Sequence, residues 1–152
     1  MKGFLLDTNV ISEIVKPEPD PRVITFLGSQ SELWLSTIVV HEIEFGLQLL
    51  PRGDRRTSLG IALAALVDEY RDFVLPVDRR EAEHAATLRV VARRSGRVLH
   101  LADALIAGTA KAHDLCLATR NARDFDGLDI DVANPWDASD LFAPLQVAQQ
   151  PV

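Results

Sequence analysis

Four polar clusters, spread over most of the chain, contain the residue types that could perform chemistry. Asp7 follows the first apolar run, where a short buried strand should give way to a helix. Glu42 lies about one turn into the helical pattern after a second strand, and Asp103 is the only acid of an apolar helix. Asn121 and Asp124 follow a further apolar strand. Because the carboxyl ends of parallel strands meet at one edge of a sheet, these side chains are expected to converge there.

Each acid also has a simpler structural explanation. Asp7 is a suitable helix N-cap, and Glu42 is placed to complement the helix dipole as a first-turn acid. Capping also explains Asp103, although apolar neighbours would partly desolvate its carboxylate, which then needs a cation or hydrogen bonds. Glu44 is expected to face the solvent. For each acid taken alone, the sequence leaves the structural and the functional interpretations open.

Several carboxylates at one sheet edge would repel each other and raise some of their pKa values, unless a divalent cation neutralises them. Oxygen ligands without a cluster of Cys or His predict a hard metal ion, Mg²⁺, with Mn²⁺ as a substitute. Such a site supports in-line attack of water on a phosphodiester, which is nuclease chemistry. A zinc protease is excluded, because Phe45 stands where a second His would have to follow His41.

Composition limits the class of protein. The chain has 152 residues and 47% hydrophobic residues, which fits one globular domain. It contains no apolar run of about 18 residues and no signal-peptide pattern, so we expect a cytoplasmic protein without a membrane segment. A net charge of −6 argues against general affinity for polyanions, so nucleic acid would need local positive charge. The arginines of residues 89–97 are expected to form a solvated helix face rather than an RNA track.

The elements that must position the acids alternate between strand and helix. Strands are predicted at 4–6, 32–36, 73–76, 115–118 and 130–132, and helices near 8–15, 22–27, 37–50, 55–70, 79–94 and 101–112. Strands separated by such helices predict βαβ units, and hence an α/β fold with a mostly parallel central sheet and helices on both faces. Residues 137–152 show little periodicity and are expected to be a loosely attached tail.

Taken together, the motifs resemble those of PIN-domain ribonucleases, and within them the VapC- or FitB-type toxins of bacterial type II toxin-antitoxin systems. The matching motifs are Asp7-Thr8-Asn9 with Ile11-Ser12-Glu13, Glu42 with Phe45-Gly46, the run 103–107, Thr119-Arg120-Asn121 with Asp124-Phe125, and Asn134-Pro135-Trp136. The resemblance spans about Lys2 to Trp136. It implies a PIN nuclease domain over residues 1–136, with a three-layer sandwich built on a sheet of about five strands.

The resemblance implies a Mg²⁺-dependent endoribonuclease that cuts cellular RNA of the tRNA or rRNA class and so stops translation. Its partner would be a DNA-binding antitoxin of the VapB or FitA type, and the nuclease would form a homodimer within the resulting hetero-oligomer. The antitoxin's C-terminal segment would occupy a groove near the acids. We expect the apolar surface for this partner along the helices at 37–50 and 55–70.

The family's site residues carry over by position. Asp7, Glu42 and Asp103 match the acidic triad that holds the metal ion. Thr8 matches a hydroxyl that helps to order the site, and Asn9 matches a polar residue that supports the first loop.

The fourth motif departs from the family pattern. Asn121 stands where many relatives have Asp, and Asp124 follows one helical turn later as the alternative metal ligand. Because an amide is a weaker Mg²⁺ ligand, Asn121 is expected to join the site by holding a water or a phosphate, and a second metal ion is in doubt. Thr119 and Arg120 are expected to support this motif.

Three other functions share part of this residue pattern. A phosphatase of the haloacid dehalogenase type needs a second acid two residues after Asp7, and Asn9 stands there, which disfavours it. A PIN-like module that binds RNA or a partner without cutting remains an alternative. A metal-dependent DNA nuclease also remains open, because the metal chemistry does not by itself select the sugar.

Overall fold

The computed structural model describes residues 2–137, and their strands form one five-stranded sheet. The strands are β1 (Phe4–Leu6), β2 (Leu33–Ser36), β3 (Val74–Leu75), β4 (Cys116–Ala118) and β5 (Val132–Ala133). They lie in the order β3-β2-β1-β4-β5, and each neighbouring pair is parallel. β1 is therefore central, and the loops after β1, β2 and β4 all leave the same edge of the sheet.

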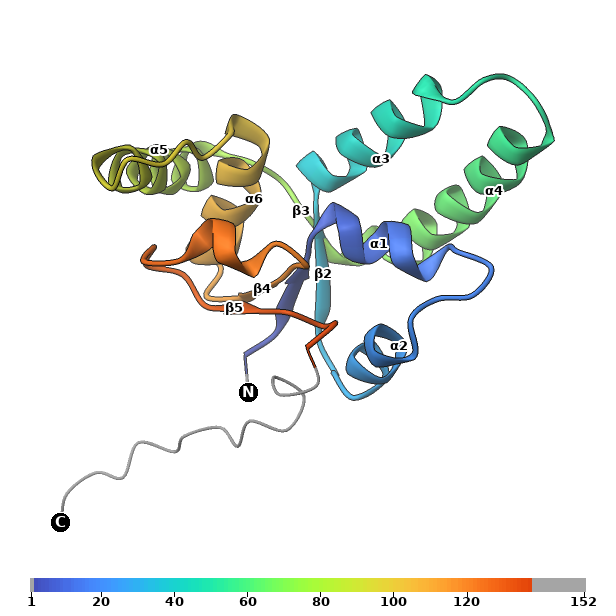
Figure 1. Cartoon of the computed structure of the whole chain (residues 1–152), viewed down its shortest axis with the longest axis horizontal. Coiled ribbons are helices and arrows are strands. Elements are labelled where there is room, and N and C mark those ends of the chain that lie inside the picture. Colours follow the sequence, from blue (N-terminus) through green and yellow to red (C-terminus); the bar gives the residue numbers. More distant parts are fainter. Residues whose placement is uncertain (1, 138–152) are drawn as a thin grey trace, which may run out of the picture.

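Helices cover both faces of this sheet (Figure 1). They are α1 (Thr8–Ile14), α2 (Pro21–Gly28), α3 (Thr37–Leu49), α4 (Asp54–Glu69), α5 (Arg79–Arg94) and α6 (Leu101–Ala112), with short 3-10 helices η1 (Arg71–Phe73) and η2 (Ala122–Phe125). In Figure 1, α5 and α6 lie on one side of the strands, and α1 and α2 lie on the other. The predicted three-layer α/β fold with a parallel sheet is confirmed. None of the helices within residues 2–137 is long and apolar enough to cross a membrane.

Burial on both faces explains why the strands are short apolar runs without alternation. Leu5 and Leu6 of β1, Leu35 of β2 and Leu117 of β4 are completely buried. The polar side chains that could perform chemistry are thereby confined to the ends of the strands.

The turns that follow β1 and β2 each lead directly into a capped helix. Asp7 caps α1, and the Ser36 hydroxyl accepts a hydrogen bond from the Val39 backbone N–H at 3.1 Å to cap α3. The Asp7 backbone N–H donates to the Ala118 carbonyl at 2.9 Å, which continues the β1–β4 ladder and puts Asp7 beside the exit of β4. The first and fourth motifs of the sequence thus meet at one edge.

Close packing of α6 on α5 positions the third motif. Gly108 makes this packing possible, because a Cβ there would lie 2.6 Å from the Glu81 carbonyl oxygen and 2.7 Å from the Ala85 nitrogen. α6 packs closely on α5, and Asp103 lies in the first turn of α6. Gly108 therefore permits the close approach of α6 to α5.

The last strand differs from the prediction. It was expected at 130–132, but β5 spans Val132–Ala133. Ile130 is β-branched, yet its backbone N–H donates to the Leu128 carbonyl at 2.8 Å in the turn after Gly127, so it does not enter the ladder. The predicted tail at 137–152 lies outside the described residues, apart from Asp137.

Candidate active site

Asp7 lies directly after β1 and is only 6% exposed. Its Oδ1 accepts a hydrogen bond from the Thr8 backbone N–H at 2.8 Å, which is the helix-capping contact. Its Oδ2 accepts from the Thr119 hydroxyl at 2.7 Å and from the Asn9 side-chain amide at 3.4 Å. Burial raises the pKa of Asp7 above the ordinary value, although the hydrogen bonds from Thr119 and Thr8 oppose this effect. The carboxylate is fixed in direction, but its charge is poorly compensated.

Thr119 links the loops that follow β1 and β4. It is completely buried, and besides donating to Asp7 its hydroxyl accepts from the Asn9 amide at 3.3 Å and from the Asn121 backbone N–H at 3.1 Å. The Asn9 side-chain oxygen accepts from the Arg120 backbone N–H at 3.2 Å. These residues therefore hold the first and fourth motifs in a fixed relation.

Asp103 comes from α6 and is partly buried. Burial raises the pKa of its carboxyl group, and repulsion from Asp7, Asp124 and Glu42 raises it further, while His100 lowers it. Four acids from four separate segments of the chain are therefore within electrostatic reach of one another.

A cleft of about 420 Å³ contains most of the predicted site residues. It is lined by Asp7, Thr8, Asn9, Ser12, Glu13, Lys16, Glu42, Asp103, Ile106, Arg120 and Asn121. Thr119 lies behind this lining as a support of Asp7. The predicted solvent-facing position of Glu44, two residues beyond Glu42 on α3, is confirmed, because Glu44 is exposed and accepts a hydrogen bond from Gln48 at 2.8 Å.

The two candidates for the fourth position differ in whether they line the cleft. Asn121 lines the cleft, whereas Asp124 does not and lies on η2, with its backbone N–H bound to the Asn121 carbonyl at 3.0 Å. Asp124 acts on the site through its charge, which raises the pKa of both Asp7 and Asp103.

Four cleft residues, Ser12, Glu13, Lys16 and Ile106, received no role from the sequence. Ser12 and Lys16 follow Thr8 at intervals of four, and Ile106 follows Asp103 by three. This helical spacing, which puts residues on one face, was the available signal.

The donors at the cleft fit a hydrated hard cation. The Thr8 hydroxyl is buried and has no hydrogen-bond partner among the described residues, although it lines the cleft together with the acids. Such a buried orphan group calls for a water or an ion. Within residues 2–137, no three His, Cys, Asp or Glu side chains are placed to hold an ion by themselves. Since Mg²⁺ usually keeps several of its waters, a site of few direct carboxylates and one hydroxyl suits it.

An apolar groove of about 470 Å³ adjoins the cleft between α1, α3 and α4. The two share Thr8, Ser12, Lys16 and Glu42 as lining residues. The apolar part of the groove is lined by Val15, Ile43, Leu47, Leu59, Ala62 and Leu63. The predicted apolar surface along the two helices is therefore present, and it opens directly onto the acids.

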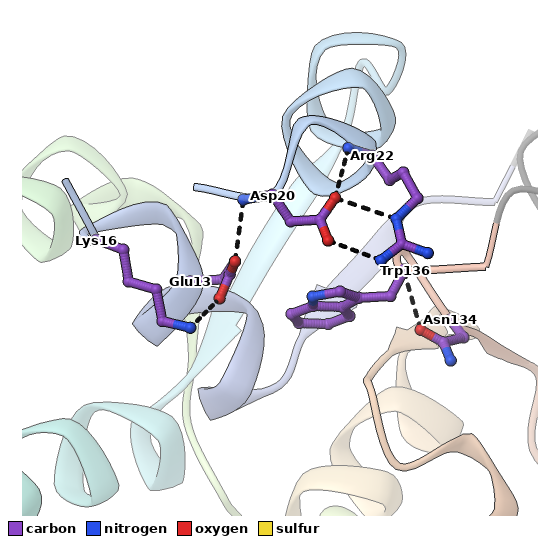
Figure 2. Close-up of polar contacts among 6 residues, drawn as sticks. All are labelled: Glu13, Lys16, Asp20, Arg22, Asn134 and Trp136. Atoms are coloured by element: carbon purple, nitrogen blue, oxygen red, sulfur yellow. Dashed lines mark hydrogen bonds and ion pairs between the residues drawn. The ribbon is translucent and has the colours of Figure 1, made fainter. Parts of the chain in front are cut away.

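Glu13 anchors one side of the cleft (Figure 2). Its carboxylate is buried, and it accepts from the Asp20 backbone N–H at 2.9 Å and pairs with the Lys16 Nζ at 2.6 Å. These contacts, the one from Lys16 first, lower the pKa of Glu13. Asp20 in turn binds the Arg22 guanidinium at 2.7 Å. Figure 2 shows the Trp136 indole beside this pair, so the chain after β5 also contributes to this side of the molecule.

The sequence profile of the PIN domain family matches residues 4–130. The VapC ribonuclease Y4jK of Sinorhizobium fredii is 41% identical over 141 residues, which cover 88% of this chain and 98% of that protein. Toxin FitB of Neisseria gonorrhoeae is 38% identical, with coverage of 88% and 98%. A solved structure of FitAB bound to a DNA fragment superposes with a TM-score of 0.81 at 36% identity, covering 88% of this chain and 96% of that one.

The raised pKa of Asp103 has a consequence for stability. At pH values between the ordinary carboxyl pKa of 3.8 and the raised pKa, Asp103 binds more protons in the folded state than in the unfolded state. The contribution of Asp103 to the free energy of unfolding therefore falls as the pH rises through this range. In metal-free buffer at pH 7, Asp103→Asn should therefore raise the free energy of unfolding, and the gain should vanish near pH 3. Urea unfolding at the two pH values measures this.

Asp54 is a matched control, because it is an exposed acid in the first turn of α4 and outside the cleft. Asp54→Asn should lower stability by about 0.3–1 kcal/mol through loss of the helix-dipole interaction. A similar loss in Asp103→Asn at pH 7 would mean that Asp103 merely complements its helix.

Proposed function

Because the chain belongs to the PIN-domain family and has VapC- and FitB-type toxins as homologues, we propose that it is a Mg²⁺-dependent endoribonuclease and the toxin of a type II toxin-antitoxin pair. The observation that carries the proposal is the cleft that Asp7, Glu42 and Asp103 line together, in which burial raises the pKa of Asp7 and Asp103. The proposed substrates are cellular RNAs of the tRNA or rRNA class.

The three acids share one task in this proposal. Asp7, Glu42 and Asp103 would hold the ion partly through its bound waters, with the Thr8 hydroxyl lining the same cleft. The chemistry that a bound Mg²⁺ would supply is positive charge to offset the charge that develops on the phosphodiester.

The neighbouring residues keep this arrangement in place. The hydrogen bonds from Thr8 and Thr119 fix the Asp7 carboxylate, so it does not reorient during the reaction. Asn121 faces the cleft as a neutral amide, which suits it to hold a water or a phosphate oxygen.

Cleavage of a single-stranded RNA oligonucleotide tests the nuclease proposal. The purified protein should cut it with Mg²⁺ or Mn²⁺ and not with EDTA, and Asp7→Asn or Asp103→Asn should slow cleavage by about 100-fold or more, since even supporting residues of metal sites cost 10–100-fold. Glu42→Gln and Glu44→Gln form a matched pair on α3, because only Glu42 lines the cleft. Glu44→Gln should cut like wild type.

Three results would contradict this proposal. Equal cleavage in EDTA would exclude the metal ion, and preferential cleavage of a DNA oligonucleotide of the same sequence would make the protein a DNA nuclease. RNA binding without cleavage would favour the non-cutting module.

We further propose that an antitoxin covers the acids from the apolar groove. The support is the groove's continuity with the cleft through Thr8 and Glu42, together with the similarity to FitAB. An apolar segment lying there would block substrate, and a basic residue on it would offset the acids. Assembly of the complex around a homodimer, and its binding to promoter DNA through the antitoxin, remain predictions.

Two alanines of α4 separate antitoxin binding from catalysis. Both are exposed, but Ala62 lines the groove and Ala65 does not. Ala62→Glu should weaken binding of the antitoxin, encoded beside this gene, by about tenfold or more, because the bound antitoxin would desolvate a carboxylate against the apolar side chains of the groove. Ala65→Glu should bind normally, and both should cut RNA. Calorimetric titration of the complex measures this, and normal binding by Ala62→Glu would place the antitoxin elsewhere.

A further inference from the structure

We propose that Lys16 and Arg120 bind backbone phosphates of the RNA that flank the scissile bond. The proposal rests on the ribonuclease function argued above. Lys16 and Arg120 both line the cleft that contains Asp7, Glu42 and Asp103. They come from opposite ends of the fold in sequence, one after α1 and the other after β4.

An RNA strand needs such cations here. The chain has a net charge of −6, and the cleft itself contains several carboxylates, so a polyanion meets repulsion on approach. The arginines of α5 do not meet this need, because Arg89, Arg93 and Arg94 lie exposed on that helix and do not line the cleft. Side-chain cations that line the cleft would offset this repulsion along the strand on either side of the reacting phosphate.

Lys16 is held in position by Glu13. Its Nζ lies 2.6 Å from the Glu13 carboxylate, which is buried and anchored in turn by the Asp20 backbone N–H. The Lys16 side chain nevertheless stays 54% exposed. An ammonium group has three donors, so one contact with Glu13 leaves others for a phosphate oxygen. Glu13 is therefore a positioning residue that fixes the cation at the mouth of the cleft.

Arg120 is positioned by an aromatic ring. Its guanidinium carbon lies 5.2 Å from the centroid of the Trp136 ring, within the range of a cation–π interaction. Trp136 is buried to 7% exposure, and its backbone N–H donates to the Asn134 side chain at 2.9 Å. The Arg120 backbone is tied to Asn9. A guanidinium that lies over an aromatic ring keeps the N–H donors at its edge available for a phosphate. The closing Asn-Pro-Trp motif would therefore position Arg120.

The salt dependence of RNA binding tests this proposal. Fluorescence anisotropy of a labelled single-stranded RNA oligonucleotide in EDTA gives the dissociation constant without cleavage. Lys16→Ala and Arg120→Ala should each reduce the slope of log K against log salt by about 0.7, and weaken binding about three- to fivefold near 0.15 M salt. Lys16→Arg and Arg120→Lys keep the charge and should keep the slope. Arg93→Ala, an exposed cation outside the cleft, should match wild type.

The outcomes distinguish this proposal from the nuclease proposal. A wild-type protein that cuts RNA, with folded Lys16→Ala and Arg120→Ala variants that keep the wild-type slope and KM, would overturn the phosphate contacts alone. An equal loss of slope in Arg93→Ala would also overturn them, because binding would then follow total charge. A wild-type protein that cuts no RNA would overturn the ribonuclease function itself.

Discussion

The confinement of Asp7, Glu42 and Asp103 to one edge of a parallel sheet is the constraint on which the rest of the structure depends. Burial and mutual repulsion raise the pKa of Asp7 and Asp103, so folding maintains an unfavourable charge arrangement there. The parallel topology imposes it, since the central position of β1 brings neighbouring loops together. Thr119 and the close packing at Gly108 keep the segments from relaxing apart. A cation relieves the repulsion without any change of fold.

Much of this arrangement could be predicted from the sequence, because the signals are local. Short apolar runs separated by helical patterns predict a parallel sheet, and polar residues after each run predict where its functional edge lies. For Asp7 the capping and functional interpretations are not exclusive, because one carboxylate oxygen caps α1 while the other meets Thr119. The start of β5 was less predictable. Ile130 has strand propensity, but its backbone N–H donates to the Leu128 carbonyl in a turn.

The remaining features depend on contacts between distant residues. Nothing near Arg120 in sequence predicts that its guanidinium stacks on Trp136, and nothing near Glu13 predicts that its carboxylate anchors Asp20 and Lys16. Helical spacing marks which residues share a face, but tertiary packing decides which faces line a cleft. The orphan hydroxyl of a cleft residue is likewise visible only when all its neighbours are placed.

Calorimetric titration of Mg²⁺ into the metal-free protein tests most directly whether the convergent acids hold a cation. We expect saturable binding to wild type, its loss in Asp7→Asn, and tighter binding in Asn121→Asp, where a carboxylate replaces the amide that lines the cleft. Binding should also release protons, since the cation displaces them from carboxyl groups of raised pKa. Heats of Mg²⁺ titration that are the same for wild type, Asp7→Asn and Asn121→Asp would show that these acids do not hold a cation.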